Sequence, residues 1–334
     1  MNLSGKGVLV TGANGFIGGA VVARLLANGS NVAGAVRRLT GASWAMSSPS
    51  LDSNADWRAL LSGKGVVVHT AARAHILNDR VADPLTEFIR VNVAGTLRLA
   101  EQAADMGVRR FVFVSSIGVN GVQSAAGRVF SEADKPNPHN AYALSKWEAE
   151  QGSMQIAVET GLEVVIIRPP LVYGCNAPGN FGSLMRAVQR GWPLPLGAVH
   201  NQRSLVALDN LVDFIVTCIT HPQAANQTFL VSDGQDLSTT ELIRGMARAA
   251  GVPARLLPVP VWALQAGAKL LGKGDAVQRL CGNLQVDISK ARELLGWVPP
   301  VSVEEGLKRA MGGMDCRASL AMTAETHNKD INKK

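Results

Sequence analysis

The sequence predicts an α/β protein with a doubly wound parallel sheet and a smaller, helix-rich C-terminal lobe. The segment GVLVTGANGFIGGAVVARLLANG, from residue 7, is a short apolar run, a glycine turn and a helical pattern that ends at Gly29. Short apolar strands then alternate with helices up to about residue 170, as in parallel sheets that are covered on both faces. Past that point the loops lengthen and helical patterns dominate.

The elements of the predicted sheet follow in order along the chain. After the first unit come strands in NVAGAVRR (31–38) and GVVVHTAA (65–72), an amphipathic helix over 83–107, a strand in RRFVFVSS (109–116), a helix that contains Tyr142, and a strand in LEVVIIRPP (162–170). Asp83 is the expected N-cap of the long helix and Gly107 its C-cap. The stretch from 40 to 60, rich in Ser, Pro and Asn, gives no clear strand and is interpreted as a variable loop.

Composition and charge argue against several classes of protein. The formal net charge is +7, but the basic residues are scattered, which disfavours nucleic acid and favours an anionic small molecule as partner. No apolar run approaches the roughly 20 residues of a transmembrane helix, and the N-terminal pattern is not that of a signal peptide. The separated cysteines at 175, 218, 281 and 316 indicate reduced thiols in a cytoplasmic protein. Neither the cysteines nor the histidines have metal-ligand spacing, so we expect no metal.

Glycines join the first strand to the first helix. Gly12, Gly15 and Gly18 occur in TGANGFIG, with Phe16 and Ile17 between the last two. Such glycines allow a tight turn and let a pyrophosphate approach the backbone N–H groups at the helix N-terminus, where the helix dipole favours negative charge. This pattern predicts a dinucleotide site of the Rossmann type.

The end of the second strand bears on the choice of dinucleotide. A fold that selects NAD usually has an acidic residue there, which binds the ribose 2′-hydroxyl. This chain has Arg37 and Arg38 instead, and their planar cations suit a 2′-phosphate. The sequence therefore favours NADP(H), with NAD(H) left open.

These patterns divide the chain. Residues 1–170 form the predicted dinucleotide-binding Rossmann core, to which some later segments return. Residues 171–313 form the predicted substrate-binding lobe, with helical patterns in 180–191, 207–221, 238–251 and 302–311. Residues 314–334 are polar and are expected to be a disordered tail.

Three residues suggest proton-transfer chemistry. Ser115 and Ser116 end the strand RRFVFVSS, at the carboxyl edge of the sheet, where open α/β folds bind ligands. Tyr142 and Lys146 share one face of the next helix, because positions four apart are neighbours. A lysine cation stabilises phenolate and lowers the tyrosine pKa, which makes the phenol usable as an acid or base. Ser116, Tyr142 and Lys146 are the candidate catalytic residues.

With TGANGFIG and with Asn92 in VNVAGT, these residues resemble the extended short-chain dehydrogenase/reductase family over roughly residues 5–312. The likeness is strongest to nucleotide-sugar 4-epimerases and 4-ketoreductases of bacterial surface-polysaccharide (O-antigen) pathways. The motifs VVVHTAARAH, IIRPPLVYG, QRSLVALDNLVDF and VDISKARELLGW all carry it.

The resemblance implies further site residues and a homodimer formed through two long helices. It assigns Lys146 to the nicotinamide ribose as well as to catalysis. The additional cofactor contacts that it implies are Ala71, Ala72, Arg73, Asn92 and Pro169. The implied contacts to the substrate are Ser116 with Asn180, Arg203 and, on a looser alignment, Arg279.

Two departures from the family pattern matter. Ile117 and Gly118 stand where 4,6-dehydratases of the family carry an acidic pair, so water elimination is disfavoured. The acidic residue that would hold the adenine has no clear counterpart, and Asp52 is a candidate only.

Several functions remain open from sequence. The first hypothesis is reduction of a UDP-linked 6-deoxy-N-acetylhexos-4-ulose at C4, in which Tyr142 protonates the oxygen. The second is 4-epimerisation of a UDP-hexose or UDP-N-acetylhexosamine by the same residues and a tightly held NAD⁺. A non-catalytic NADP sensor is disfavoured, since Ser116, Tyr142 and Lys146 are all present. Reduction of ketones that carry no nucleotide also stays open and would not need Arg203.

Overall fold

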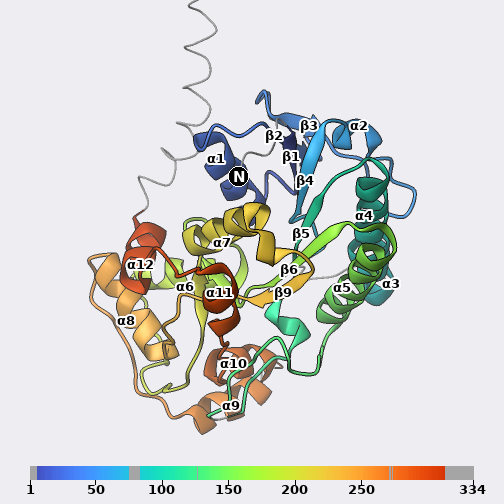
Figure 1. The fold of residues 1–334 in the computed structure, drawn as a ribbon. Helices are drawn as coiled ribbons and strands as arrows, with labels where there is room; N and C mark the ends of the chain where they lie inside the picture. The colour runs from blue at the N-terminus through green and yellow to red at the C-terminus, as the bar shows by residue number, and fades with distance from the viewer. Residues whose placement is uncertain (1–5, 75–82, 126, 271, 273, 313–334) are drawn as a thin grey trace, which may run out of the picture.

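The computed structural model describes residues 6–74, 83–125, 127–270, 272 and 274–312. Its centre is a seven-stranded parallel sheet with helices on both faces (Figure 1). The strands, in spatial order, are β3 (Ala45–Ser47), β2 (Val32–Val36), β1 (Gly7–Thr11), β4 (Lys64–His69), β5 (Arg110–Val114), β6 (Glu163–Arg168) and β9 (Gln227–Leu230). The chain runs outward from β1 in one direction and then from β4 in the other, so the predicted doubly wound sheet is confirmed.

The helices and a second, two-stranded sheet complete the described fold. The α-helices are α1 (Phe16–Ala27), α2 (Arg58–Leu61), α3 (Pro84–Phe88), α4 (Gly95–Asp105), α5 (Ala141–Thr160), α6 (Gly179–Gln189), α7 (Leu208–Thr220), α8 (Thr239–Ala249), α9 (Val261–Leu270), α10 (Gly274–Cys281), α11 (Ser289–Leu295) and α12 (Val303–Met311). Short 3₁₀ turns span Ile117–Val119 and Pro222–Ala224, and β7 (Leu171–Tyr173) pairs in parallel with β8 (Leu205–Ala207).

Alternation along the strands builds two apolar layers. Val8 and Val10 point to a layer formed with α1, α7 and α11, whereas Leu9 points to a layer formed with α2, α4 and α5. A third cluster, around Phe181 and Met246, holds β7 and β8 together with α6, α8 and α12. In Figure 1 the helices α8, α9, α10 and α12 lie away from the β2–β3 end of the sheet.

The stretch interpreted as a variable loop contains regular structure. Residues 45–47 form β3, which pairs in parallel with β2, and residues 58–61 form α2. The buried side chain of Gln102 ties the segment down: its Oε1 accepts from Trp57 N at 2.7 Å, and its Nε2 donates to Ala55 O at 2.8 Å. The interpretation was wrong because β3 depends on its pairing with β2, and the start of α2 depends on Gln102, 45 residues beyond Trp57, neither of which a local pattern reveals.

The long helix predicted over 83–107 is interrupted. Asp83 is its N-cap, as predicted, and accepts from the N–H groups of Leu85 and Thr86. A π-helical turn, Ile89–Ala94, then separates α3 from α4 and carries the buried Asn92. Such turns are frequent at functional sites, and this one aims the Asn92 side chain at the loop after β4.

The expectation of reduced thiols can be checked for two of the four cysteines, and Cys316 lies outside the described residues. Cys218 and Cys281 are free. Within the described residues, no helix combines the length and apolar character needed to cross a membrane.

Helix α7 connects the sheet to the C-terminal segments. At its C-terminal end, the fully buried Arg110 of β5 donates from Nη1 to the carbonyls of Cys218, Ile219 and His221, at 2.7, 3.1 and 2.8 Å. Arg110 Nε also donates to Glu163, at the start of β6, at 2.7 Å. This arginine therefore caps α7 and fixes it against the amino ends of β5 and β6.

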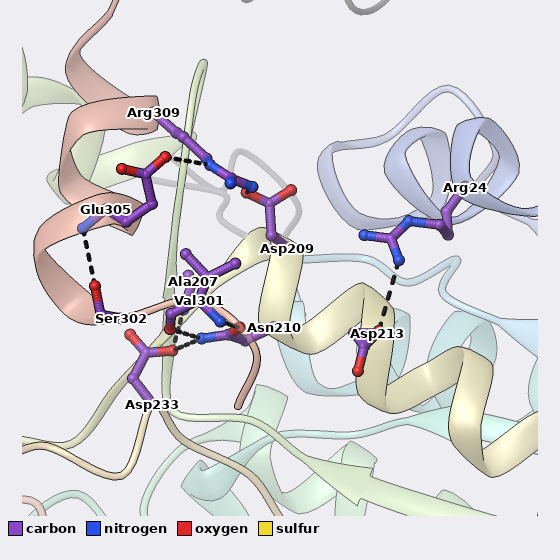
Figure 2. Close-up of polar contacts among 10 residues, drawn as sticks. All are labelled: Arg24, Ala207, Asp209, Asn210, Asp213, Asp233, Val301, Ser302, Glu305 and Arg309. Atoms are coloured by element: carbon purple, nitrogen blue, oxygen red, sulfur yellow. Dashed lines mark hydrogen bonds and ion pairs between the residues drawn. The ribbon is translucent and has the colours of Figure 1, made fainter. Parts of the chain in front are cut away.

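Figure 2 shows the contacts of α7 nearer its N-terminus. The Asn210 side chain donates to Val301 O at 2.8 Å and accepts from Val301 N at 2.9 Å. Asp209 and Asp213 form ion pairs with Arg309 of α12 and Arg24 of α1. One helix thus contacts α1, the segment before α12, and α12 itself.

A buried histidine gives the fold a pH dependence. His69 is fully buried at the end of β4, with Nδ1 2.7 Å from Thr11 Oγ1 and Nε2 3.0 Å from Thr96 Oγ1. Burial, and secondarily the charge of Lys146, lowers the His69 pKa from 6.5 to about 3. The unfolded chain therefore takes up this proton below about pH 6.5, whereas the folded chain stays neutral there until about pH 3.

We predict that His69→Gln flattens the acid side of the stability profile. Glutamine keeps a donor and an acceptor for Thr11 and Thr96 but does not titrate. As the pH falls from 6.5 to 3, the unfolding free energy of the unmodified protein should decrease faster than that of the variant. The extra effect of His69 is an increase of up to about tenfold in the unfolding constant for each pH unit. Urea titrations at several pH values measure this, and parallel profiles for the two proteins would contradict it.

Candidate functional site

The candidate site lies at the carboxyl edge of the sheet, between the parallel neighbours β1 and β4, where the order of the strands reverses. The loops after these strands touch: Thr70 Oγ1 donates to Thr11 O at 2.6 Å, and Ala71 N donates to Thr11 Oγ1 at 3.3 Å. The loop after β5 meets the segment after β6, where Ile117 N donates to Pro169 O at 3.0 Å. The edge therefore brings together segments that are distant in sequence.

The glycine loop after β1 is closely packed. Gly12 adopts a left-handed conformation (φ +66°), and a Cβ there would lie 2.9 Å from Ala71 N. A Cβ on Gly18 would clash with the Gly12 carbonyl and would lie 2.6 Å from Thr70 Oγ1. Gly15, the N-cap of α1, has no side chain to cover the first N–H groups, and the first turn of α1 contains no acidic residue. The loop thus leaves a helix N-terminus open to an anion.

The loop after β4 is held by the π-helical turn. Asn92 Oδ1 accepts from Arg73 N at 2.8 Å, and Asn92 Nδ2 donates to Arg73 O at 3.1 Å and to Ser145 Oγ at 3.0 Å. The Arg73 guanidinium lies 5.6 Å from the centre of the Phe88 ring. Ala71 therefore lies against the glycine loop, and Asn92 fixes the backbone of Arg73 two residues further on.

The adenine end has two sets of candidates. Arg37 and Arg38 follow β2 and are exposed, and neither forms a hydrogen bond or ion pair with another described residue. Asp52 lies in the loop after β3, where it accepts from Asn54 N at 2.9 Å and pairs with Arg90 at 3.3 Å. Its carboxylate is thus already engaged by the protein.

Ser116, Tyr142 and Lys146 come from two neighbouring elements. Ser116 caps the 3₁₀ turn after β5, with its Oγ accepting from Gly118 N at 3.1 Å. Tyr142 and Lys146 lie in the first turns of α5, whose N-cap Asn140 accepts from Ala143 N at 2.8 Å. Lys146 is buried and donates from Nζ to Val114 O at 2.9 Å, beside Ser115 and Ser116.

The pKa values of the pair differ from the sequence-based expectation. Burial raises the pKa of Tyr142 to about 12, so Lys146 does not produce the lowered phenol pKa that was expected. Burial also lowers the Lys146 pKa to about 7, against the opposing charge of Glu150. The ammonium points to the Val114 carbonyl and lies 4.5 Å from the centre of the Phe113 ring. In this structure, desolvation by burial is the main cause of both pKa shifts.

The structure also shows a buried polar cluster that the sequence analysis did not identify. Glu150, the next residue on the Tyr142–Lys146 face of α5, accepts from Ser115 Oγ at 2.5 Å and from Arg168 Nη2 at 2.6 Å. Arg168 also donates to Asn120 Oδ1 at 2.9 Å. The spacing of Tyr142, Lys146 and Glu150, each four residues after the last, was the sequence signal that could have revealed this carboxylate.

The predicted substrate residues are dispersed. Asn180 is exposed in the first turn of α6, and Arg279 is exposed on α10. Arg203 is largely buried, donates to Gly282 O at 3.0 Å, and has its pKa lowered by burial. The structure thus places Arg203 at the end of the helix that carries Arg279, whereas Asn180 belongs to another element.

A hollow of about 340 Å³ opens next to this junction. It is lined by Gln123, Ala198, His200, Asn201, Val261, Cys281 and Asn283. Its polar lining is mainly of amides, with a cysteine and a histidine, and Asn201 is held by Leu280 O and Gly282 O at 3.0 and 2.8 Å. None of the four predicted substrate residues, Ser116, Asn180, Arg203 and Arg279, lines it directly.

Comparisons with known proteins agree with this architecture. The chain is 49% identical over 308 residues to a UDP-glucose 4-epimerase of Vibrio cholerae, with 91% of this chain and 94% of that protein covered. The fold matches UDP-glucose 4-epimerase of Thermotoga maritima, solved with UDP-glucose (TM-score 0.75, 24% identity, 93% and 99% of the two chains). It also matches MoeE5, solved with UDP-glucuronic acid and NAD (TM-score 0.74, 25% identity, 93% and 99%).

A family model places the chain among known enzymes. Residues 8–232 match the model of the NAD dependent epimerase/dehydratase family, a span that includes the glycine loop, the Tyr142–Lys146 helix and all of the seven-stranded sheet except Gly7. The resemblance that the sequence motifs carried is confirmed. The chain belongs to the NAD dependent epimerase/dehydratase family.

Proposed function

We propose that the protein is a 4-epimerase of a UDP-hexose or UDP-N-acetylhexosamine, with NAD as a retained cofactor. The observation that carries this proposal is the 49% identity to a UDP-glucose 4-epimerase over 91% of the chain. The candidate site is compatible, because Ser116 follows β5 and Lys146 donates to Val114 O, at the same carboxyl edge of the sheet as the glycine loop after β1. Reduction of a 4-keto sugar, the first hypothesis from sequence, has weaker support.

The residues of the glycine loop fit a dinucleotide. A pyrophosphate suits the open N-terminus of α1 and the close-packed loop, in which Gly12 and Gly18 leave no room for a Cβ. Ala71–Arg73 would border the cofactor. Bound NAD supplies the carbon that accepts a hydride from C4 of the sugar and gives it back. Epimerisation requires that the hydride return to the opposite face of C4.

The chain's own residues handle the proton. Tyr142 would take the proton from the C4 hydroxyl of the sugar during oxidation and return it to that oxygen during reduction. Its pKa of about 12 suits proton donation at neutral pH, so the base step needs a lower phenol pKa in the filled site. Lys146 is the cation on the same helix face for that task, and the Ser116 hydroxyl can hydrogen-bond to the reacting oxygen.

One observation favours the reductase reading. Arg37 and Arg38 are exposed where an NAD-selective fold usually has an acidic residue, and a 2′-phosphate would suit them. A reductase must also release its oxidised cofactor in every cycle, whereas an epimerase restores it.

The decisive experiment is to identify the nucleotide in untreated, purified protein and to assay it without added cofactor. We expect retained NAD(H) near one per chain and interconversion of UDP-glucose with UDP-galactose, or of the N-acetylated pair. A site without nucleotide, in a protein that consumes NADPH with a UDP-4-keto sugar, would instead establish the reductase.

We predict that Tyr142→Phe lowers kcat at least about a hundredfold, because it removes the proton-transferring hydroxyl and leaves the ring in contact with Phe88. Nucleotide retention should stay as in the unmodified protein. Steady-state kinetics with nucleotide extraction measure both, and activity within a few-fold of the unmodified protein would exclude Tyr142 as the acid or base.

We also predict that Gly18→Ala and Gly19→Ala differ sharply. A methyl group at Gly18 meets the Gly12 carbonyl, and this overpacking should cost roughly 1–3 kcal/mol of stability and reduce nucleotide retention. At Gly19 the nearest atom, Ala13 O, is 3.4 Å away, so alanine should be neutral or stabilise the helix by up to about 1 kcal/mol. Thermal melts and nucleotide extraction compare the two, and equal effects would contradict the close approach.

A further inference from the structure

The buried cluster around Glu150 touches both elements that carry the candidate catalytic residues. Glu150 is 1% exposed and lies on α5, one turn after Lys146. Its carboxylate accepts from Arg168 at 2.6 and 3.0 Å, and Arg168, at the end of β6, is itself 4% exposed. The two charges must be paired, because an unpaired charge buried in the protein interior would destabilise the fold.

The cluster fixes the end of β5. Ser115 Oγ donates to Glu150 Oε1 at 2.5 Å, and Ser115 N donates to Ile167 O at 2.7 Å. Ser115 lies between Val114, whose carbonyl receives the Lys146 ammonium, and the candidate catalytic Ser116. The Glu150 carboxylate therefore sets the position of the strand end relative to the helix that carries Tyr142 and Lys146.

Arg168 extends the same restraint beyond Ser116. Its Nη1 donates to Asn120 Oδ1 at 2.9 Å, and Asn120 Nδ2 donates to Ser131 O at 2.9 Å. Asn120 directly follows the 3₁₀ turn that Ser116 caps. The residues before and after that turn are thus tied to one buried ion pair.

The same carboxylate acts on Lys146 through charge. Two titratable groups interact with Lys146 through charge: His69 on β4 and Glu150 on α5. Tyr142 shares the same face of α5, and Arg168 of β6 is paired to Glu150. His69 is neutral above about pH 3 and Tyr142 is neutral below about pH 12. Glu150 is therefore the group that opposes the loss of the Lys146 proton on burial.

We propose that Glu150 is a positioning residue: together with Arg168 it locks the end of β5 onto α5 and supplies the negative charge that favours the ammonium form of Lys146. The inference rests on the proposed function for the meaning of the site, because it assumes that Lys146 acts in its charged form beside Tyr142. It adds a carboxylate, outside the Ser116–Tyr142–Lys146 set, that acts through Ser115 and Lys146 and does not touch substrate.

The test compares Glu150→Gln, Glu150→Asp and Glu163→Gln. Glutamine removes the charge at nearly constant shape, and aspartate keeps the charge but shortens the reach to Ser115. Glu163 is the matched control, because it pairs with the buried Arg110 on the same two strands, β5 and β6, at their opposite ends.

The first readout follows Lys146 itself and needs no substrate. NMR of lysine-labelled protein, with the resonance assigned by Lys146→Arg, gives its titration midpoint. We expect Glu150→Gln to lower the midpoint by about one pH unit, a tenfold change in the ammonium fraction, and Glu150→Asp and Glu163→Gln to leave it in place. An unchanged midpoint in Glu150→Gln would overturn the electrostatic part of the proposal.

The second readout is the pH profile of kcat for the proposed epimerisation. The alkaline limb should move to lower pH by the same amount in Glu150→Gln only, while Glu150→Asp keeps the limb and loses kcat several-fold because the Ser115 contact lengthens. Normal kcat in Glu150→Asp would refute the positional role.

If Glu150→Gln does not fold, Glu150→Gln combined with Arg168→Gln, which removes both charges, takes its place in both readouts. If the unmodified protein shows no epimerase activity, the proposed function fails while the NMR midpoints still decide the inference.

Discussion

The burial of both faces of the parallel sheet is the constraint on which the rest of the structure depends. With apolar layers above and below, neither face of the strands is left for polar chemistry, and functional groups can gather only where strands end. Thr11 and His69 end β1 and β4 at this edge, and Ser116 lies two residues beyond the end of β5. The site is therefore a consequence of the layering, before any particular side chain is considered.

Burial so close to the edge also shapes the chemistry of the site. Lys146 and Tyr142 are held where both charged forms are disfavoured, so the resting structure contains a neutral phenol and a lysine that titrates near pH 7. The polar partners that remain, the Val114 carbonyl and the Glu150 carboxylate, are themselves fixed by strand ends and by Arg168. Small displacements of β5 would therefore alter both the position of Lys146 and the charge that it carries.

Much of the fold could be predicted from the sequence, because its strongest signals are local. The apolar runs, the Asp83 cap and the glycine turn each depend on neighbours a few residues away, and each appears in the structure as expected. What could not be predicted depends on contacts outside the local sequence: the strand at 45–47, which pairs with β2, and the π-helical turn at Asn92, whose side chain bonds to Arg73 and Ser145. The direction of the Tyr142 pKa was wrong for the same reason, since desolvation is a property of the packed interior. The catalytic roles of Ser116, Tyr142 and Lys146 stay predictions.

The path of α7 and β9 has a consequence for how the protein is made. Strand β9 completes the sheet beside β6, and α7 covers the sheet and is capped by Arg110. Both elements follow β7, α6 and β8 in the sequence. As the chain leaves the ribosome from its N-terminus, the first 170 residues emerge with an unpaired edge on β6 and with Arg110 without its helix. The Rossmann core therefore reaches its final form only after most of the chain, including α6 and β8, has been synthesised.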